Sequence, residues 1–456
     1  MRHVGEMEVS KRIPTARTSA PRAKALTSWG RMTAVGREVS HERLEEATHG
    51  AALARGMARS YGDASLPAAP VDRLASTLMA NRVLGFCNET GKLRAESGLT
   101  LADLNRLFLP RGWFTPVSPG TQFVTLGGMV ASDVHGKNHH RDGCFGAHLT
   151  ALRVRLGDGD IVDCSPEEHS DLFYGCIGGM GLLGHILEVE FSLRAIPSGW
   201  IRAETRRVDH LADFLSALAE GASRWPYTMG WIDCLSGQAR LGRGVLIAGE
   251  WAGTAPGTGE RARRPVRFPF DLPAGVLNRY TARAFNAAFF RSHPAGVSQN
   301  LSSSEPFFYP LDRVLDWNRA YGKRGFTQYQ CVLPRAAGPE AVHEFMRRMV
   351  ETQSSSPLCV IKDCGPEGKG VLSFPLEGTS IAADMQITAE TKRIVQQLND
   401  FVIAVGGRIY LTKDQFTTRQ AFAAMEPRLG AFNALRERWD PNRRLRSALS
   451  QRLLEY

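Results

Sequence analysis

The sequence predicts an α+β protein with two domains. Its 456 residues exceed what one hydrophobic core usually holds. From residue 51 to about 193, short apolar runs are broken by Gly, Asp and Asn, which is typical of short strands with small helices between them. Beyond Pro197 the apolar runs lengthen and helical patterns recur between them, which favours a sheet with helices on one face.

The first part is expected to hold short strands and one small helix. Residues 101–109 have apolar side chains at helical spacing. The strand-like runs 149–156 and 161–162 flank Gly157-Asp158-Gly159-Asp160, a strong signal for a β-hairpin turn. Residues 185–193 predict a further strand.

The second part alternates longer strands with helices. The expected strands are 225–234, 328–334 and 359–362, and the expected helices are 211–219, 311–321, 339–352 and 390–405. Gly406-Gly407 should end the last helix before a strand at 408–411. Residues 252–267 have few apolar side chains and predict a loop, and the tail 419–456 predicts helices interrupted near Asp440-Pro441.

Composition limits the classes of partner. A hydrophobic content of 43% and a charged content of 22% are ordinary for a soluble globular enzyme. The net charge is +10, but the basic residues are scattered and no nucleic-acid motif accompanies them, so we expect no nucleic-acid partner. Attraction to a phosphorylated ligand or an acidic membrane surface stays open. No apolar run reaches the ~18 residues of a transmembrane helix.

The cysteines and the N-terminus carry no targeting or metal signal. None of the eight cysteines forms a CxxC pair, and most have apolar neighbours, so we expect reduced thiols in the core and no disulfide framework or zinc site. Lys137, His139 and His140 lack a fitting fourth ligand for a metal. Residues 1–25 are basic without an apolar core, which predicts a disordered lead-in and excludes a secretory signal.

Three glycine-rich segments carry the functional signal. They are 54–63, 116–140 and 178–186, and the last has four glycines within seven residues. The second continues into a run with three histidines, a lysine and an asparagine. One such segment alone is more often a surface turn, but three within about 130 residues favour a backbone cradle for a flat or phosphorylated ligand. Neither a GxGxxG fingerprint opening a long helix nor a GxxxxGK[ST] loop is present, which argues against NAD and ATP.

Together these segments resemble the vanillyl-alcohol-oxidase (PCMH) type of FAD-binding family. The motifs SYGD, PGT, TLGG, HGKNHH and GGMGLLG carry the resemblance. Within that family, the chain is similar to oxidases that act on polyprenylphosphoryl ribose. This similarity runs from about residue 26 to the end, through LTSWGR at 26–31, YPLD at 309–312, WNRAYG at 317–322, LSFP at 372–375 and GGRIY at 406–410.

The resemblance implies a two-domain PCMH-type fold with an inserted substrate domain of antiparallel sheet and helices. FAD would be bound by residues 26–196 and 406–456, and the substrate by residues 197–405. The implied FAD contacts are Ala54, Arg55, Gly56, Met57, Ala58, Arg59, Ser60, Tyr61, Gly62, Asp63, Ala64, Gly120, Thr125, Leu126, Gly127, Gly128, Ser132, Asp133, Val134, His135, Ile186 and Tyr410. Arg59 stands near the place where several relatives carry a flavin-linked histidine, so FAD is expected to be noncovalent.

The resemblance also implies catalytic and substrate residues. Lys413 would stabilise the reduced flavin and hold the sugar hydroxyl, while His135 and Tyr61 would orient or deprotonate that hydroxyl. The implied substrate contacts are Gln328, Gln330, Lys362, Trp231, Phe308, Ser380, Ala382 and Lys137. Three of these differ from the family pattern: Ala382 replaces a cysteine, Ser380 an asparagine, and Phe308 a tyrosine of a flexible lid.

The implied activity is FAD-dependent oxidation of the 2′-hydroxyl of polyprenylphosphoryl-β-D-ribose to the 2′-keto sugar, the first half of epimerisation to arabinose. A separate NADH-dependent keto-reductase would complete it. The expected location is the cytoplasm or the inner face of the membrane, with peripheral association. One alternative is a soluble sugar, alditol or aldonolactone oxidase of the same fold, and another is a basic binding protein whose glycine loops merely turn.

Overall fold

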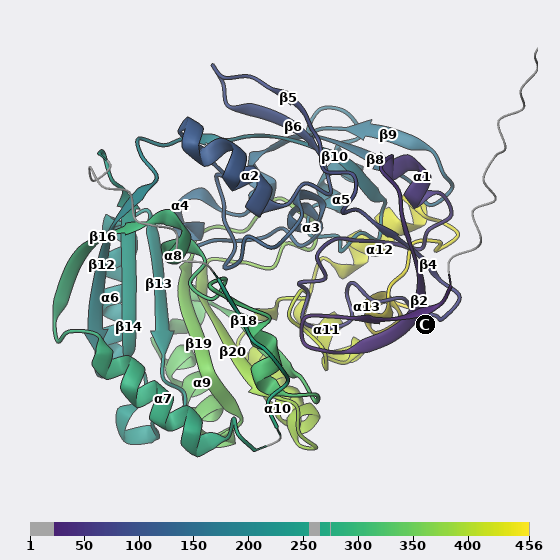
Figure 1. Cartoon of the computed structure of the whole chain (residues 1–456). Coiled ribbons are helices and arrows are strands. Elements are labelled where there is room, and N and C mark those ends of the chain that lie inside the picture. The colour runs from purple at the N-terminus through teal and green to yellow at the C-terminus, as the bar shows by residue number, and fades with distance from the viewer. Residues whose placement is uncertain (1–21, 255–264, 274, 456) are drawn as a thin grey trace, which may run out of the picture.

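A computed structural model describes residues 22–254, 265–273 and 275–455 (Figure 1). Most of the expected lead-in therefore lies outside the described residues. Its last two positions belong to a strand, because β1 begins at Lys24. Helices and strands both contribute extensively, which confirms the α+β class.

The first part of the chain forms two main sheets. A four-stranded sheet has the order β1-β2-β4-β3, and a five-stranded antiparallel sheet has the order β5-β6-β10-β8-β9. The expected hairpin is confirmed, since the strands on either side of residues 157–160 pair with each other. The strands are β1 (Lys24–Thr27), β2 (Thr33–Ser40), β3 (Leu53–Arg55), β4 (Arg73–Ser76), β5 (Val83–Phe86), β6 (Lys92–Glu96), β8 (Leu149–Arg155), β9 (Ile161–Cys164) and β10 (His185–Ser192), with a small pair β7 (Trp113–Phe114) and β11 (Arg194–Ala195).

Short helices connect these strands. The helix expected at 101–109 is confirmed as α2 (Leu101–Phe108). Thr100 caps α2 by accepting a hydrogen bond from the Asp103 backbone N–H at 3.1 Å, which satisfies one of the free donors at a helix start. The other helices are α1 (Leu44–Thr48), α3 (Leu126–Ala131), α4 (His139–Asp142) and α5 (Ser170–Cys176), with 3₁₀ turns η1 (Leu109–Arg111) and η2 (Phe145–His148).

The second part is built on one eight-stranded sheet, here called the large sheet. Its order is β16-β12-β14-β13-β19-β20-β18-β21, and each pairing is antiparallel. The three strands expected here are confirmed as β13, β18 and β19. The strands are β12 (Trp200–Val208), β13 (Tyr227–Ile232), β14 (Gly244–Trp251), β16 (Val297–Ser303), β18 (Phe326–Pro334), β19 (Ser355–Cys364), β20 (Gly378–Gln386) and β21 (Arg408–Ile409).

Helices cover both faces of the large sheet. α6 (Leu211–Arg224), α9 (Gly338–Thr352) and α10 (Thr391–Ala404) pack on one face around Phe214, Phe345 and Leu398 (Figure 1). The expectation of helices on one face is nevertheless wrong. A further helix, α7 (Arg279–Ser292), packs against Trp231 of β13. The next residue, Ile232, packs against the helices of the first face. Because adjacent side chains of a strand point to opposite faces, α7 lies on the other face of the sheet.

The helix expected at 311–321 is also wrong. The segment contains the short strand β17 (Val314–Leu315) and the 3₁₀ turn η4 (Trp317–Tyr321), following the short helix α8 (Ser304–Phe308). Asp316 has a left-handed backbone, with φ of 58°, which breaks a helix between the two. β17 pairs instead with β15 (Val266–Arg267), the end of the loop expected at 252–267, whose residues 255–264 lie outside the described chain. The remaining 3₁₀ turns are η3 (Gln238–Arg240) and η5 (Arg335–Ala337).

The C-terminal tail returns to the first part of the chain. It forms α11 (Arg419–Met425), α12 (Leu429–Trp439) and α13 (Ala448–Leu453), with the expected interruption after Trp439. Phe432, Leu449 and Leu453 are fully buried in the same hydrophobic cluster as the five-stranded sheet. The tail thus contributes to the core of the N-terminal sheets, while α6, α9 and α10 enclose a separate core against the large sheet.

The cysteines confirm the expectation of core thiols. None of the eight forms a disulfide, and all but Cys87 are buried. Burial raises the pKa of the Cys164 thiol to about 12, so it stays protonated at neutral pH.

Candidate active site

A cavity of about 980 Å³ lies between the glycine-rich bends and the face of the large sheet that α7 partly covers. Small-molecule sites occupy roughly 300–1,000 Å³, so this cavity has room for a ligand much larger than one sugar. The bends supply one wall from backbone and small side chains. The large sheet supplies the opposite wall from longer polar and aromatic side chains.

The alternation of side chains along the strands decides which residues face the cavity. On β18, Tyr329 and Cys331 pack against the helices, so Gln328 and Gln330 point to the opposite face and line the cavity. The strand register places Gln330 opposite Ala382. All of the expected substrate contacts on this sheet line the cavity: Trp231, Gln328, Gln330, Lys362, Ser380 and Ala382.

The three bends lie in direct contact with one another. A Cβ atom at Gly56 would lie 2.3 Å from Thr125 Oγ1, so the first bend approaches the second more closely than any side chain allows. The third bend is bound to the second by a 2.9 Å hydrogen bond from the Met180 backbone N–H to the Ala131 carbonyl. The sequence interpretation of one shared cradle therefore agrees with the structure.

The first bend is also bound to the C-terminal part of the chain. The Tyr61 backbone N–H donates to the Thr412 carbonyl at 2.9 Å. A Cβ at Gly62 would lie 1.9 Å from the Asp414 carbonyl oxygen, so a larger residue would push the two segments apart. This contact places Lys413 beside the first bend.

Most of the expected FAD contacts line the cavity, but four do not. Those in the cavity wall are Ala54, Arg55, Gly56, Met57, Ala58, Arg59, Ser60, Tyr61, Ala64, Gly120, Thr125, Gly127, Gly128, Ser132, Val134, His135, Ile186 and Tyr410. Gly62, Asp63, Leu126 and Asp133 lie behind it, which corrects the expectation for these residues. Asp63 pairs with Arg452 at 2.7 Å, and Leu126 is fully buried in the core, so both hold the bends from the rear.

Several polar atoms in the cavity wall have no protein partner. The buried hydroxyls of Ser65, Thr77 and Ser97 form no hydrogen bond within the described chain, although all three residues line the cavity. Buried polar groups in native proteins are almost always hydrogen-bonded, so these atoms fit a polar ligand against the bends. Bare backbone, unpaired hydroxyls and the volume of the cavity together suit FAD.

Lys413 and Tyr61 lie together at the junction of the two walls. Lys413 Nζ is 3.8 Å from the centroid of the Tyr61 ring, a close cation–π contact. Burial lowers the pKa of Lys413, and the carboxylate of Asp384 opposes this effect. Burial also raises the pKa of Tyr61 well above its usual range, so the phenol keeps its proton at neutral pH.

Asp384 is a buried carboxylate that no sequence motif singled out. It is fully buried, and it accepts hydrogen bonds from Gln328 Nε2 at 2.5 Å and from the Tyr321 hydroxyl at 3.1 Å. Burial raises the pKa of Asp384. Its position on β20, two residues after Ala382 and therefore on the same face, is the signal that could have identified it.

His135 is held as a neutral ring. Its Nε2 accepts a hydrogen bond from the Gln330 amide at 3.0 Å, which leaves the proton on Nδ1. The same amide lies 3.3 Å from the Ser380 hydroxyl. Burial, followed by repulsion from Lys362, holds the pKa of His135 well below its usual range. The ring is thus placed to orient Gln330 and is a poor proton acceptor.

Two more lysines line the cavity near the large sheet. Lys137 Nζ donates to the Phe308 carbonyl at 3.1 Å, and burial lowers the pKa of Lys137 to about 7. Burial also lowers the pKa of Lys362. Phe308 itself is 1% exposed and packs against Phe114, so it does not form the expected substrate wall or a flexible lid. Phe308 contributes to the site through its backbone carbonyl, which accepts the hydrogen bond from Lys137.

The histidines after Lys137 have separate partners. His139 Nδ1 accepts from the Gly365 backbone N–H at 3.1 Å, and His140 Nε2 bonds with the Trp225 carbonyl at 3.0 Å. Across residues 22–254, 265–273 and 275–455, no three His, Cys, Asp or Glu side chains gather in a way that could hold a metal ion.

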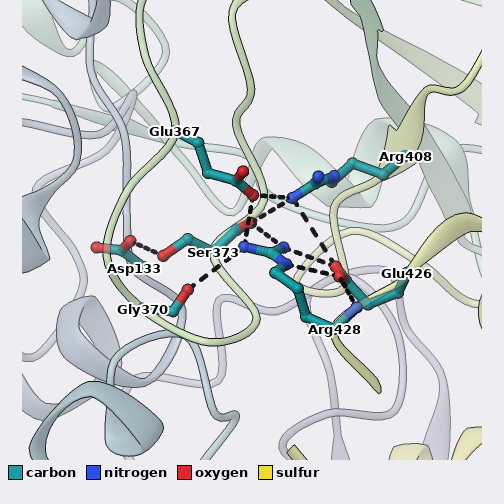
Figure 2. Close-up of polar contacts among 7 residues, drawn as sticks. All are labelled: Asp133, Glu367, Gly370, Ser373, Arg408, Glu426 and Arg428. Carbon is teal, nitrogen blue, oxygen red and sulfur yellow. Dashed lines mark hydrogen bonds and ion pairs between the residues drawn. The ribbon is translucent and has the colours of Figure 1, made fainter. Parts of the chain in front are cut away.

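An ionic network lies close to Asp133, a residue of the second bend (Figure 2). Arg428 pairs with Glu426 at 2.7 Å and with Glu367 at 2.6 Å, and Arg408 pairs with Glu367. Glu426 and Arg408 are largely buried, where removing one member leaves a costly unpaired charge. The network fixes the 367–374 loop to the C-terminal segment.

Ser373 connects this ionic network to Asp133, next to the cavity wall. Its carbonyl accepts from Arg428 Nη2 at 2.8 Å, and its hydroxyl donates to the Asp133 carboxylate (Figure 2). Asp133 also accepts from the Gly146 backbone N–H at 2.8 Å, and it has a left-handed backbone with φ of 37°. Burial raises the pKa of Asp133 to about 6. Asp133 is therefore a support for the adjoining His135 rather than a wall residue.

Comparisons with known proteins agree with this site. Residues 46–165 match the family described as "FAD binding domain". The chain is 32% identical over 415 residues to "Decaprenylphosphoryl-beta-D-ribose oxidase" of Mycolicibacterium smegmatis, covering 88% of both proteins. It is 30% identical over 369 residues to "Uncharacterized protein in mprA 5'region" of Streptomyces coelicolor, covering 78% of this chain and 100% of that protein.

A more distant similarity covers only a short stretch of the chain. The human "Delta(24)-sterol reductase" is 34% identical over 106 residues, which are 23% of this chain and 20% of the reductase. The cofactor is FAD, as the family match and the bends of the cavity both indicate. Because the M. smegmatis protein is matched over 88% of its length, this chain belongs to the decaprenylphosphoryl-β-D-ribose oxidase family and is an FAD-dependent oxidoreductase.

Proposed function

We propose that this enzyme oxidises the 2′-hydroxyl of a polyprenylphosphoryl-β-D-ribose to the 2′-keto sugar. The observation that carries the proposal is a pair of lysines in the cavity wall, Lys137 and Lys362, neither of which forms an ion pair within the described chain. Enclosed cations need an anionic partner, and a phosphodiester on the substrate would supply it. The name of the M. smegmatis relative supports the same substrate class.

FAD, when bound, supplies the acceptor for the hydride of the carbinol. The hydroxyl proton must then pass to the protein or to water. We assign Lys413 as its acceptor, because burial lowers the pKa of Lys413 and so favours a neutral amine near neutral pH. Tyr61 would hold that amine in place and, as a protonated phenol, donate a hydrogen bond to the sugar.

The large sheet would position the sugar and the phosphate. Gln328 and Gln330 present amides that Asp384 and His135 fix in orientation, so the amide oxygens of both are left as acceptors for ribose hydroxyls. Lys362 and Lys137 would meet the phosphate, and Trp231 would pack on an apolar part of the substrate. His135 has a positioning role in this scheme.

The same reasoning supports a division of the chain. We assign FAD binding to residues 26–196 and 406–456, and substrate binding to residues 197–405. The burial of Leu449 and Leu453 in the N-terminal core supports joining the tail to the first part. We also infer that a separate NADH-dependent keto-reductase consumes the 2′-keto product, since an epimerisation must return the electrons to the sugar.

The place of action is a further part of the proposal. No helix in residues 22–254, 265–273 or 275–455 is both long enough and apolar enough to cross a bilayer. We propose that the enzyme works in the cytoplasm or at the inner face of the membrane, where it would meet a lipid-linked sugar through peripheral association.

Anaerobic flavin reduction tests the proposed reaction. Polyprenylphosphoryl ribose should bleach the flavin of the wild-type protein, and Lys362→Gln should require a higher substrate concentration. Lys392→Gln, an exposed lysine on α10, is the matched control and should behave as wild type. Bleaching by free alditols or aldonolactones without bleaching by the lipid would replace the proposal with the soluble-oxidase alternative.

A further inference from the structure

The cavity opens to solvent through a surface of apolar side chains. Val276, Phe285 and Val314 line the cavity and are also between 37% and 56% exposed, so they mark its mouth. Phe270 and Tyr280 lie just outside the cavity and are 57% and 64% exposed. We call this group of residues, with Val266, the mouth surface. Its residues lie on α7, β15, β17 and the segments between β15 and α7, and α7 is at the lower end of the molecule in Figure 1.

The apolar lining continues inward from this surface. Phe268, Leu272, Leu277, Phe289 and Leu311 line the cavity directly beneath it. Phe285 and Phe289 stack one helical turn apart on α7, with ring centroids 6.2 Å apart, so one aromatic row runs from the outside to the cavity. A continuous apolar track of this kind would cost free energy if it faced water alone.

The charges around the mouth surface are strongly one-sided. Residues 265–273, 275–291 and 313–324 contain eight Lys or Arg residues and two Asp residues. Both aspartates are already paired, Asp271 with Arg31 and Arg319, and Asp316 with Arg267. Lys323 and Arg324 are exposed. The surface is therefore apolar at its centre and cationic at its edge.

We propose that the mouth surface lies against an anionic membrane. Aromatic side chains at the centre would enter the interface, and the lysines and arginines would meet anionic lipid headgroups. For the route of the lipid tail, the inference rests on the proposed function: the tail would pass from the bilayer along the apolar track into the cavity. A membrane fits better than a second protein because the cationic edge surrounds aromatic residues at a cavity entrance, an arrangement that matches an anionic headgroup layer above an apolar interior.

Vesicle flotation of the full-length holoenzyme tests the proposal. Wild type should float with vesicles of phosphatidylcholine containing phosphatidylglycerol and should bind pure phosphatidylcholine more weakly, with binding that falls as salt rises. Phe270→Ser with Tyr280→Ser should abolish flotation. Lys323→Gln with Arg324→Gln should weaken binding about 30-fold, since each cation near an anionic surface contributes about fivefold.

Matched controls use exposed residues far from the mouth. Val83→Ser with Leu84→Ser alters an exposed apolar pair on β5, at the opposite end of Figure 1, and Arg37→Gln with Lys392→Gln removes two exposed cations elsewhere. Both should float as wild type does. Retained flavin absorbance checks that each variant is folded.

The outcomes separate this proposal from the proposed function. Flotation that is absent for wild type, or unchanged in both mouth variants, would overturn the membrane face. Flavin bleaching by a short-chain, water-soluble polyprenylphosphoryl ribose, measured without vesicles, reports the reaction alone. Vesicle binding without bleaching would keep the membrane face and reject the substrate.

Discussion

Arg452 links three separate parts of the site, and its removal should destabilise the protein strongly. The guanidinium on α13 donates to Asp63 at 2.7 and 2.8 Å, to Asp414 at 2.8 Å and to the Thr417 carbonyl at 2.6 Å. Asp63 follows the first bend, and Asp414 follows Lys413. The Arg452→Met variant keeps the apolar stem but leaves both carboxylates without their cation.

The size of the effect follows from burial. The side chains of Asp63 and Asp414 are 4% and 7% exposed, while that of Arg452 is 23% exposed. Breaking a buried ion pair by removing one partner costs about 3–5 kcal/mol. Because Arg452 keeps some contact with water, we expect a loss of about 3 kcal/mol in the free energy of unfolding. FAD affinity should fall as well, since the first bend loses its rear support.

Urea unfolding of the holoenzyme, together with titration of FAD, measures both effects. Arg438→Met is the matched control, because its pair with Asp171 has an arginine that is 65% exposed, and exposed pairs contribute less than about 1 kcal/mol. An Arg452→Met variant that unfolds within about 1 kcal/mol of wild type, with unchanged FAD affinity, would refute the view that Arg452 supports the bend.

Three further predictions concern the cofactor and the proton. Acid denaturation should release all flavin, because residues 54–64 contain no histidine or cysteine to form a flavin bond; flavin that stays with the polypeptide would contradict this. Burial lowers the pKa of Lys413, so kcat/KM should rise with pH as the amine loses its proton and should level off below pH 10.5. The Lys413→Gln variant should lose this rise with pH and react about 10²–10⁴ times more slowly. A variant that still shows the rise would exclude Lys413 as the proton acceptor. Ser373→Ala should weaken FAD binding and cost about 1–3 kcal/mol in urea unfolding, because Asp133 loses a buried donor, whereas Ser216→Ala, at an exposed hydroxyl on α6, should change neither.

Local signals in the sequence predicted the elements that depend on neighbours along the chain. The hairpin at residues 157–160 and the helix beginning at Leu101 follow from turn residues and from apolar periodicity, and both are confirmed. The helix expected at 311–321 failed because its apolar spacing also suits a strand that pairs with residues 266–267, some 50 positions earlier. No local pattern reports such a partner.

The sequence by itself determined the glycine bends, the lack of CxxC cysteine pairs and the family, because these depend on residue type and order. Only the tertiary structure decided which residues face the cavity. The alternation of side chains along β20 directs Asp384 toward the site, where it accepts a hydrogen bond from Gln328. Phe308 instead packs into the aromatic core and does not line the site. The physical reason is that a side chain's direction and burial depend on segments distant in sequence, as when Arg452 reaches Asp63 across the fold.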